Sequence, residues 1–187
     1  IEDESNSDEK YLRNKIRNFL NSFDDKETIV ERVSSAVDRI NKCKESFLKQ
    51  VNEAKNEILK FDFDKCIFYV DNIFKYDNSI VLRLLVKALM NESGNIYKPR
   101  LEKLKRLFDE IVRFYFDRTI NLKYTFYGCV IEKINDKEIA IYREYNSIGE
   151  DVTLEYNKEV IWDNRFKVTL RNKDIKNIKI THLQENE

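Results

Sequence analysis

The stretch LEKLKRLFDEIVRFYFDRTINLKYTFYGCVIEKINDKEIAIYREY, residues 101–145, contains the change of periodicity that decides the fold class. Up to Phe116 its apolar residues recur every three or four positions, the pattern of an amphipathic helix. From Tyr124 onward, two runs of apolar and aromatic residues flank the polar turn Asn135-Asp136-Lys137, which predicts a β-hairpin. The sequence therefore predicts an α+β fold, an α-helical domain followed by a small, mainly antiparallel β module.

Four helices are predicted before the hairpin. The first runs from about Asp8 to Asn21, and a long second helix runs from about Asp25 to Leu59. The third, Ser79–Asn91, is apolar almost all round, so we expect it to be the central buried helix. Gly94 follows it as a C-terminal cap. The fourth runs from Pro99 to about Phe116, because proline is tolerated in the first turn of a helix.

The remaining segments complete the predicted organisation. A short apolar run, Cys66–Val70, is either extended or a short helix. Further strand candidates follow the hairpin: Val152–Tyr156, Val160–Trp162, Arg165–Leu170 and a last one through Ile175, Ile178 and Ile180. The chain thus divides into a polar linker (1–9), a helical domain (10–118) and a β-rich C-terminal module (119–187).

The long second helix has two interpretations. Its apolar stripe comprises Val30, Val33, Val37, Ile40, Phe47, Val51, Ala54 and Ile58. The stripe could pack in an antiparallel bundle against the rest of the chain, or form an intermolecular coiled coil that would make the protein a homodimer. We favour the bundle, since the apolar helices that follow need a partner to bury them.

Composition excludes several function classes. Lysine plus arginine and aspartate plus glutamate number 34 each, so bulk charge indicates no partner. With three glycines, the chain has no phosphate-cradling loop. Three scattered cysteines and one histidine do not predict a zinc site, and the unpaired cysteine pattern favours a reducing, cytoplasmic compartment. No apolar run is long enough to cross a membrane, and no catalytic constellation is present.

Positive charge is nevertheless clustered locally. KYLRNKIR (10–17) carries four cations, residues 98–123 carry eight against four acidic residues, and residues 165–179 carry six against one. Each cluster is either a solvated face or a surface for phosphate. The aromatic residues of the β region are interpreted mainly as core, the alternative being a platform on which bases stack.

The beginning of the chain carries the most specific motif. EDESNSDEKYLRNKIRNFL (2–20) resembles the segment of tRNA(Ile)-lysidine synthetases that has an Asp-Pro-Ser-Asn turn and an aromatic-x-Arg-Asn-x-x-Arg helix. Glu4 replaces the usual proline and Asn18 a common histidine. Three further matches follow in the family's order: Tyr97-Lys98-Pro99-Arg100, Tyr142-Arg143-Glu144 and Ile161-Trp162-Asp163-Asn164-Arg165-Phe166.

This resemblance implies a function for the chain. Members of the family use ATP to join lysine to the wobble cytidine of an isoleucine tRNA with a CAU anticodon. Their ATP site, with Mg, is a PP-loop on an N-terminal domain, and this sequence has no such motif, so no cofactor, catalytic or metal residue is assigned here. The chain would supply tRNA docking, with these candidate nucleic-acid-binding residues: Arg13, Asn14, Arg17, Arg100, Arg143 and Arg165. The alternatives are a helical scaffold and the tRNA-binding region of another PP-loop enzyme.

Overall fold

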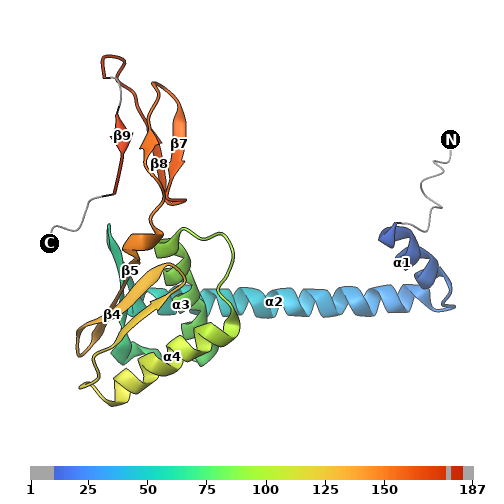
Figure 1. The fold of residues 1–187 in the computed structure, drawn as a ribbon. Helices are drawn as coiled ribbons and strands as arrows, with labels where there is room; N and C mark the ends of the chain where they lie inside the picture. The colour runs from blue at the N-terminus through green and yellow to red at the C-terminus, as the bar shows by residue number, and fades with distance from the viewer. Residues whose placement is uncertain (1–10, 176–177, 183–187) are drawn as a thin grey trace. The chain divides into compact units, whose positions relative to one another are not determined.

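The protein is described by a computed structural model that covers residues 11–175 and 178–182 (Figure 1). It contains two compact units, one ending at Lys49 and the other beginning at Gln50. Four α-helices are present in this part of the chain: α1 (Leu12–Asn21), α2 (Lys26–Ile58), α3 (Asn78–Ser93) and α4 (Leu101–Phe116). None of these helices has the length and apolar character needed to cross a membrane. The four predicted helices are confirmed, although residues 8–10 of the first lie outside the described residues.

The first unit consists of α1 and most of α2. The turn that ends α1 is closed by Ser22, whose hydroxyl donates a hydrogen bond of 2.6 Å to the carbonyl of Phe19. The predicted apolar stripes are present but largely exposed, with Leu12, Ile16, Phe19, Val30, Val33, Val37 and Ile40 among the exposed residues. Only the last part of the α2 stripe, which belongs to the second unit, is buried: Val51, Ala54 and Ile58. The interpretation of the exposed part as bundle or coiled coil stays a prediction.

The second unit is built on a five-stranded antiparallel sheet of order β1-β2-β5-β4-β3. Its strands are β1 (Leu59–Phe61), β2 (Lys65–Tyr69), β3 (Lys123–Phe126), β4 (Cys129–Asn135) and β5 (Glu138–Arg143). Side chains alternate between the two faces, and one face carries fully buried residues such as Phe68, Ile141 and Ile131. The Cys129 thiol on this face lies 3.6 Å from the carbonyl of Leu89, so the buried face is the one that α3 covers.

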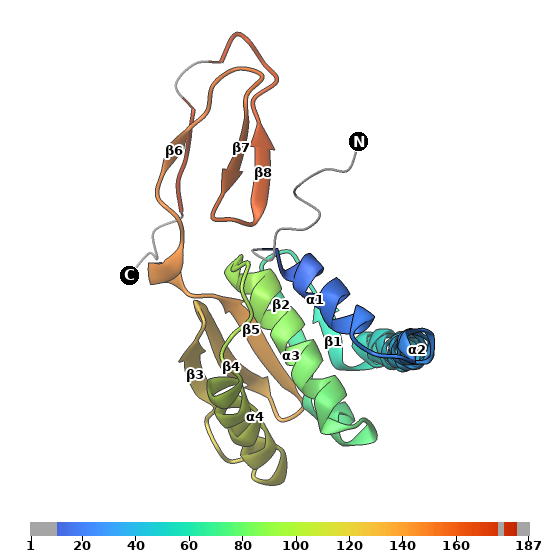
Figure 2. The ribbon, with the colours of Figure 1, turned by 90° about the vertical axis from the view of Figure 1, so that its right-hand side faces the viewer.

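Helix α3 is the buried centre that its sequence predicts. Asp77 caps its first turn by accepting hydrogen bonds from the Ser79 amide (2.8 Å) and hydroxyl (2.5 Å). Its apolar residues are buried: Ile80, Val81, Leu84, Leu85, Ala88 and Leu89. Gly94 ends the helix at φ +67°, the left-handed conformation predicted for this cap. Figure 2 shows α3 lying across the strands of the sheet.

The observed sheet differs from the sequence predictions in two respects. The run Cys66–Val70 provides strand β2, which pairs with β5 from Lys65↔Tyr142 to Tyr69↔Glu138. One sheet therefore takes strands from both sides of residue 118, and the predicted boundary there does not separate two folding units. The predicted strand Tyr124–Ile134 is two strands, because Tyr127 and Gly128 adopt φ values of 61° and 74° and reverse the chain between β3 and β4.

Two small ribbons follow the sheet. Strand β6 (Val152–Thr153) pairs with β9 (Lys179–Ile180), and β7 (Glu159–Trp162) pairs with β8 (Phe166–Thr169), both antiparallel. These strands confirm the predicted candidates, with β7 one residue longer than predicted and the other three shorter, although residues 176–177 of the last candidate lie outside the described residues. Leu154 and Leu170 are the buried apolar residues of the ribbons. Figures 1 and 2 show both ribbons leaving the sheet beyond the end of β5.

Because the sheet takes strands from both sides of residue 118, we can predict how fragments of the protein cut near that residue behave. A fragment of residues 119–187 lacks β1, β2 and α3, so it would expose the buried face of β5 and β4 to water. We expect this fragment to show a poorly dispersed amide proton spectrum and no cooperative thermal transition. A fragment of residues 50–187 should give dispersed signals and one transition. Cooperative folding of the shorter fragment would contradict the single-unit description.

Candidate functional site

The ribbons are joined to the sheet through a buried carboxylate. Asp163 follows β7, and the turn to β8 places Asp163 and Asn164 at φ values of 51° and 55°. Both central residues of a tight hairpin turn of this type need positive φ, which Asp and Asn tolerate better than most residues. A hydrogen bond of 3.1 Å from the Arg165 amide to the Trp162 carbonyl closes the turn. The Asp163 side chain is 1% exposed.

Arg143, at the end of β5, uses all its donors in this joint. A guanidinium group has five N–H donors, and five acceptors surround this one. Its Nε and Nη2 donate to the two carboxylate oxygens of Asp163, at 3.1 and 2.6 Å. The other acceptors are backbone carbonyls, those of Ser93 (2.7 Å), Gly128 (3.4 Å) and Ser147. The side chain therefore links the end of α3, the β3–β4 turn and the segment after β5.

Arg165 completes the joint from the other side. Its Nε and Nη2 lie 2.8 and 2.7 Å from Oδ2 of Asp163. The backbone amide of Gly149 donates to Oδ1 of the same carboxylate at 2.9 Å. A buried carboxylate with two guanidinium partners and a backbone donor has its acceptor sites satisfied, which is the condition for burying such a charge without a large penalty. We call Arg143, Asp163 and Arg165 the arginine joint.

All three glycines of the chain lie against the arginine joint. A Cβ atom at Gly94 would stand 2.7 Å from the Asp163 carbonyl oxygen, and one at Gly149 would stand 3.2 Å from the Asp163 Cα. A Cβ atom at Gly128 would stand 2.8 Å from Nη1 of Arg143. Close backbone approach is a general use of glycine, and in this glycine-poor chain it is concentrated at one place.

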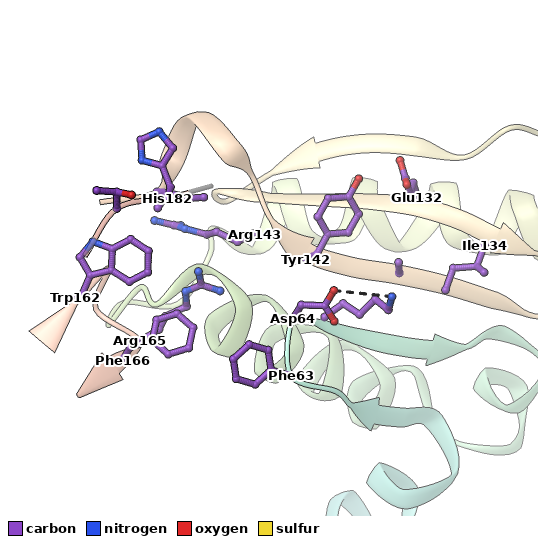
Figure 3. Close-up of a pocket in the computed structure, with 14 residues that line it drawn as sticks. Phe63, Asp64, Glu132, Ile134, Tyr142, Arg143, Trp162, Arg165, Phe166 and His182 are labelled. Atoms are coloured by element: carbon purple, nitrogen blue, oxygen red, sulfur yellow. Dashed lines mark ion pairs between the residues drawn. The ribbon is translucent and has the colours of Figure 1, made fainter. Parts of the chain in front are cut away.

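A groove of about 690 Å³ opens beside the arginine joint (Figure 3). Its lining includes aromatic and cationic side chains from both the sheet and the ribbons: Phe63, Tyr142, Arg143, Trp162, Arg165 and Phe166. The ring centroids of Trp162 and Phe166 are 5.9 Å apart with 29° between their planes. The indole N–H of Trp162 donates to the Glu150 carbonyl at 3.0 Å. The groove therefore has a fixed aromatic wall.

Buried titratable groups near the joint do not form a nucleophilic centre. Burial raises the pKa of the Cys129 thiol to about 12 and raises the pKa of Cys66 as well. Both thiols are therefore protonated at neutral pH, and the protonated form is the unreactive one. Burial also raises the pKa of Glu92, opposed by a hydrogen bond from Asn91 and by the charge of Arg165. Among the described residues, no three His, Cys, Asp or Glu side chains are arranged to hold a metal ion.

The structure brings together two of the six predicted site residues, Arg143 and Arg165, and buries most of both. The other three arginines are exposed: Arg13 and Arg17 on α1, and Arg100 at the residue before α4. Asn14 is 2% exposed. Because every N–H of Arg143 already has an acceptor, its predicted contact with RNA stays a prediction that the geometry does not favour.

Sequence reasoning gave no role to Asp163 or to Phe63. A signal for Asp163 was available, because an Asp-Asn pair between two strand candidates is typical of a turn with positive φ. No sequence signal could have paired its carboxylate with Arg143, twenty positions earlier in the chain. Phe63 lies between Asp62 and Asp64, and nothing in that local sequence places it in the groove that Trp162 also lines.

No family model matches the chain, but curated relatives do. The chain is 31% identical over 186 residues to the tRNA(Ile)-lysidine synthase of Rickettsia felis, which covers 98% of this chain and 41% of the relative. The enzyme of the same name from Wolbachia pipientis wMel is 31% identical over 172 residues, covering 91% and 39%. That from Rickettsia typhi is 31% identical over 185 residues, covering 98% and 41%.

The relatives are all synthases whose name refers to a transfer RNA, and this defines the class of protein. The chain belongs to the tRNA(Ile)-lysidine synthase family, as its sequence motifs indicated. It spans about 40% of the length of the curated relatives it matches.

Removing the carboxylate of the arginine joint should destabilise the second unit. In Asp163→Asn, two mostly buried guanidinium groups lose their counter-charge, and breaking a buried ion pair of this kind costs about 3–5 kcal/mol. The measurement is the free energy of unfolding in urea. Asp109→Asn, an exposed carboxylate on α4, serves as the matched control and should stay within about 0.5 kcal/mol of the unaltered protein. Equal stability of the two variants would show that the joint is dispensable.

Proposed function

We propose that this chain contributes the tRNA-docking surface of a tRNA(Ile)-lysidine synthase, an ATP-dependent ligase that joins lysine to the wobble cytidine of isoleucine tRNA. The observation that carries the proposal is the match of 91–98% of the chain to enzymes with this name. The ATP, with Mg, and the lysine would bind in the part of the enzyme that the chain does not span. Docking through the chain would then position one base for reaction.

The exposed cations of the second unit support the docking role. Lys98, Arg100, Lys103, Lys105 and Arg106 lie before and along the first turns of α4, and all are exposed. None of them forms an ion pair with another residue of the described part of the chain. Arg113, further along the helix, is paired with Glu110 at 2.9 Å. Cations without a protein counter-charge are the ones available to phosphate.

Arg13 and Arg17 supply a second set of available cations, on the first unit. Both are exposed and lie four residues apart on α1, so they share one face of that helix. The guanidinium of Arg13 lies 5.6 Å from the ring centroid of Tyr11. Such a row can make paired hydrogen bonds to successive phosphate oxygens.

A homodimer is a second assembly that one observation favours. Val30, Val33, Val37 and Ile40 are each 45–65% exposed along one stripe of α2. Apolar residues at this spacing are the contact positions of paired helices. In this arrangement the first unit would hold two enzymes together in addition to presenting Arg13 and Arg17.

The docking proposal predicts steep salt dependence of tRNA binding. If about five phosphates are neutralised, log affinity should fall against log salt with a slope of about −4. The combined variant Arg100→Ala, Lys103→Ala and Arg106→Ala should flatten the slope by about one for each lost phosphate contact. Filter binding of isoleucine tRNA at several salt concentrations measures both slopes. Lys158→Ala, whose ammonium is paired with Glu155 at 3.0 Å, should leave the slope unchanged, and a flat response of the unaltered protein would refute electrostatic docking.

The Arg13–Arg17 row can be tested in the whole enzyme. Both side chains are exposed, so Arg13→Ala with Arg17→Ala should change stability by no more than about 0.5 kcal/mol each. Loss of one charge-assisted contact should lower the rate of lysidine formation about ten- to hundred-fold. A thermal melt and a lysidine assay on one preparation give both values. Unchanged turnover with an unchanged melt would remove both arginines from the docking surface.

A further inference from the structure

Phe63 is an aromatic side chain with no part in the core. It lies in the turn between β1 and β2, where its amide donates to the Asp62 carboxylate at 3.0 Å. Its side chain is 90% exposed. Exposure of this extent means that the fold gains almost nothing from the ring, because buried area is the source of apolar stabilisation. The ring lines the groove beside the arginine joint.

The opposite part of the groove is a preformed aromatic and cationic cluster. Phe166 contacts Trp162 on one side and the guanidinium of Arg165, 4.9 Å from its ring centroid, on another. In the view of Figure 3, Arg165 and Phe166 lie between Trp162 and Phe63. Bonding to Asp163 fixes Arg165, and the hydrogen bond to Glu150 fixes Trp162. The cluster is thus held in place before any ligand binds, which lowers the cost of binding.

The charged side chains that line the groove indicate which part of a ligand it can bind. Asp64 and Glu132 line it together with Lys65 and Arg165. Carboxylates accept hydrogen bonds only, so they bind the amino and imino N–H groups of a base and repel phosphate. The cations of the lining already have protein counter-charges, since Arg165 lies 2.7 Å from Asp163 and Lys65 lies 4.0 Å from Asp64, so the groove is not a phosphate site of its own. A nucleotide therefore fits this groove through its base, whose N–H groups suit the carboxylates and whose planar ring can stack on an exposed aromatic side chain.

We propose that this groove binds one unpaired nucleotide of RNA, with its base stacked on Phe63 and against the Arg165–Phe166 pair. The inference rests on the proposed function, since it assigns a contact within tRNA docking. Bases of single strands stack on aromatic rings and on guanidinium planes, whereas paired bases are already stacked within their helix. The volume of about 690 Å³ is in the range of small-molecule sites, about 300–1,000 Å³.

The only tryptophan of the chain reports on the groove. Trp162 is that residue, so the tryptophan fluorescence of the 187-residue chain should change when a nucleotide enters. The probe is a six-nucleotide single-stranded RNA, titrated against the same sequence annealed to its complement. We expect the single strand to change the fluorescence at lower concentration than the duplex does. Equal responses to the two RNAs would overturn the preference for an unpaired nucleotide.

Substitutions of Phe63 separate stacking from general binding. Phe63→Ala should weaken single-strand binding about 5- to 150-fold, the effect of losing one base–aromatic stack. Phe63→Tyr keeps the ring and should bind like the unaltered chain, while Phe63→Leu should behave like Phe63→Ala. Phe116→Ala is the matched control, because Phe116 is 75% exposed on α4 and does not line the groove. A thermal melt of each variant verifies the fold.

Filter binding of tRNA by the same preparations distinguishes the two proposals. Salt-dependent tRNA binding together with no Phe63 effect on the single strand would overturn this inference and leave the docking role intact. Failure of the unaltered chain to bind either tRNA or the single strand would overturn both. Loss of single-strand binding in Phe63→Ala and Phe63→Leu, with the melt and Phe63→Tyr unchanged, supports the groove as a nucleotide site.

Discussion

The carboxylate of Asp163 is the interaction on which the second unit depends, because it brings the end of β5, the segment around Gly149 and the β7–β8 turn to one buried point. It accepts hydrogen bonds from Arg143 at the end of β5, from Arg165 immediately before β8 and from the backbone amide of Gly149. A buried charge is tolerated only when its hydrogen-bonding capacity is met. The backbone must therefore come close on several sides, and the placement of all three glycines against the joint follows from that requirement.

The arginine joint also divides the cationic residues into two kinds. Arg143 donates its hydrogen bonds to a carboxylate and to backbone carbonyls, so it holds these segments of the chain in place. Lys98, Arg100 and their neighbours at α4 have no counter-charge among the described residues and remain available to phosphate. A positive cluster in the sequence does not distinguish these two uses, because the distinction lies in which acceptors are within about 3 Å of each guanidinium.

The groove lies beside the arginine joint and takes part of its wall from it. Its cationic wall includes Arg165, which the joint holds, and its aromatic wall is oriented by the Trp162 bond to Glu150. Phe63 differs from these residues, since it is exposed and lies in a turn. A surface with one wall fixed in advance and a single exposed ring opposite is suited to a planar ligand, because stacking demands parallel faces and little else.

Local sequence determined the elements of this protein, and tertiary structure decided how they combine. The periodicity of residues 78–116 and the cap at Gly94 were sufficient to predict α3 and α4, because helix formation depends on neighbours three and four positions apart. The same patterns could not show that β2 pairs with β5, since strand partners are chosen by packing between distant segments. Arg143 and Asp163 were both visible in family motifs, yet their contact spans twenty positions and exists only after the sheet and the ribbons meet. The sequence thus indicated Arg143 and Arg165 as residues of interest, while only the fold decided that both hold the structure through Asp163, because their partners become neighbours only when distant segments pack together.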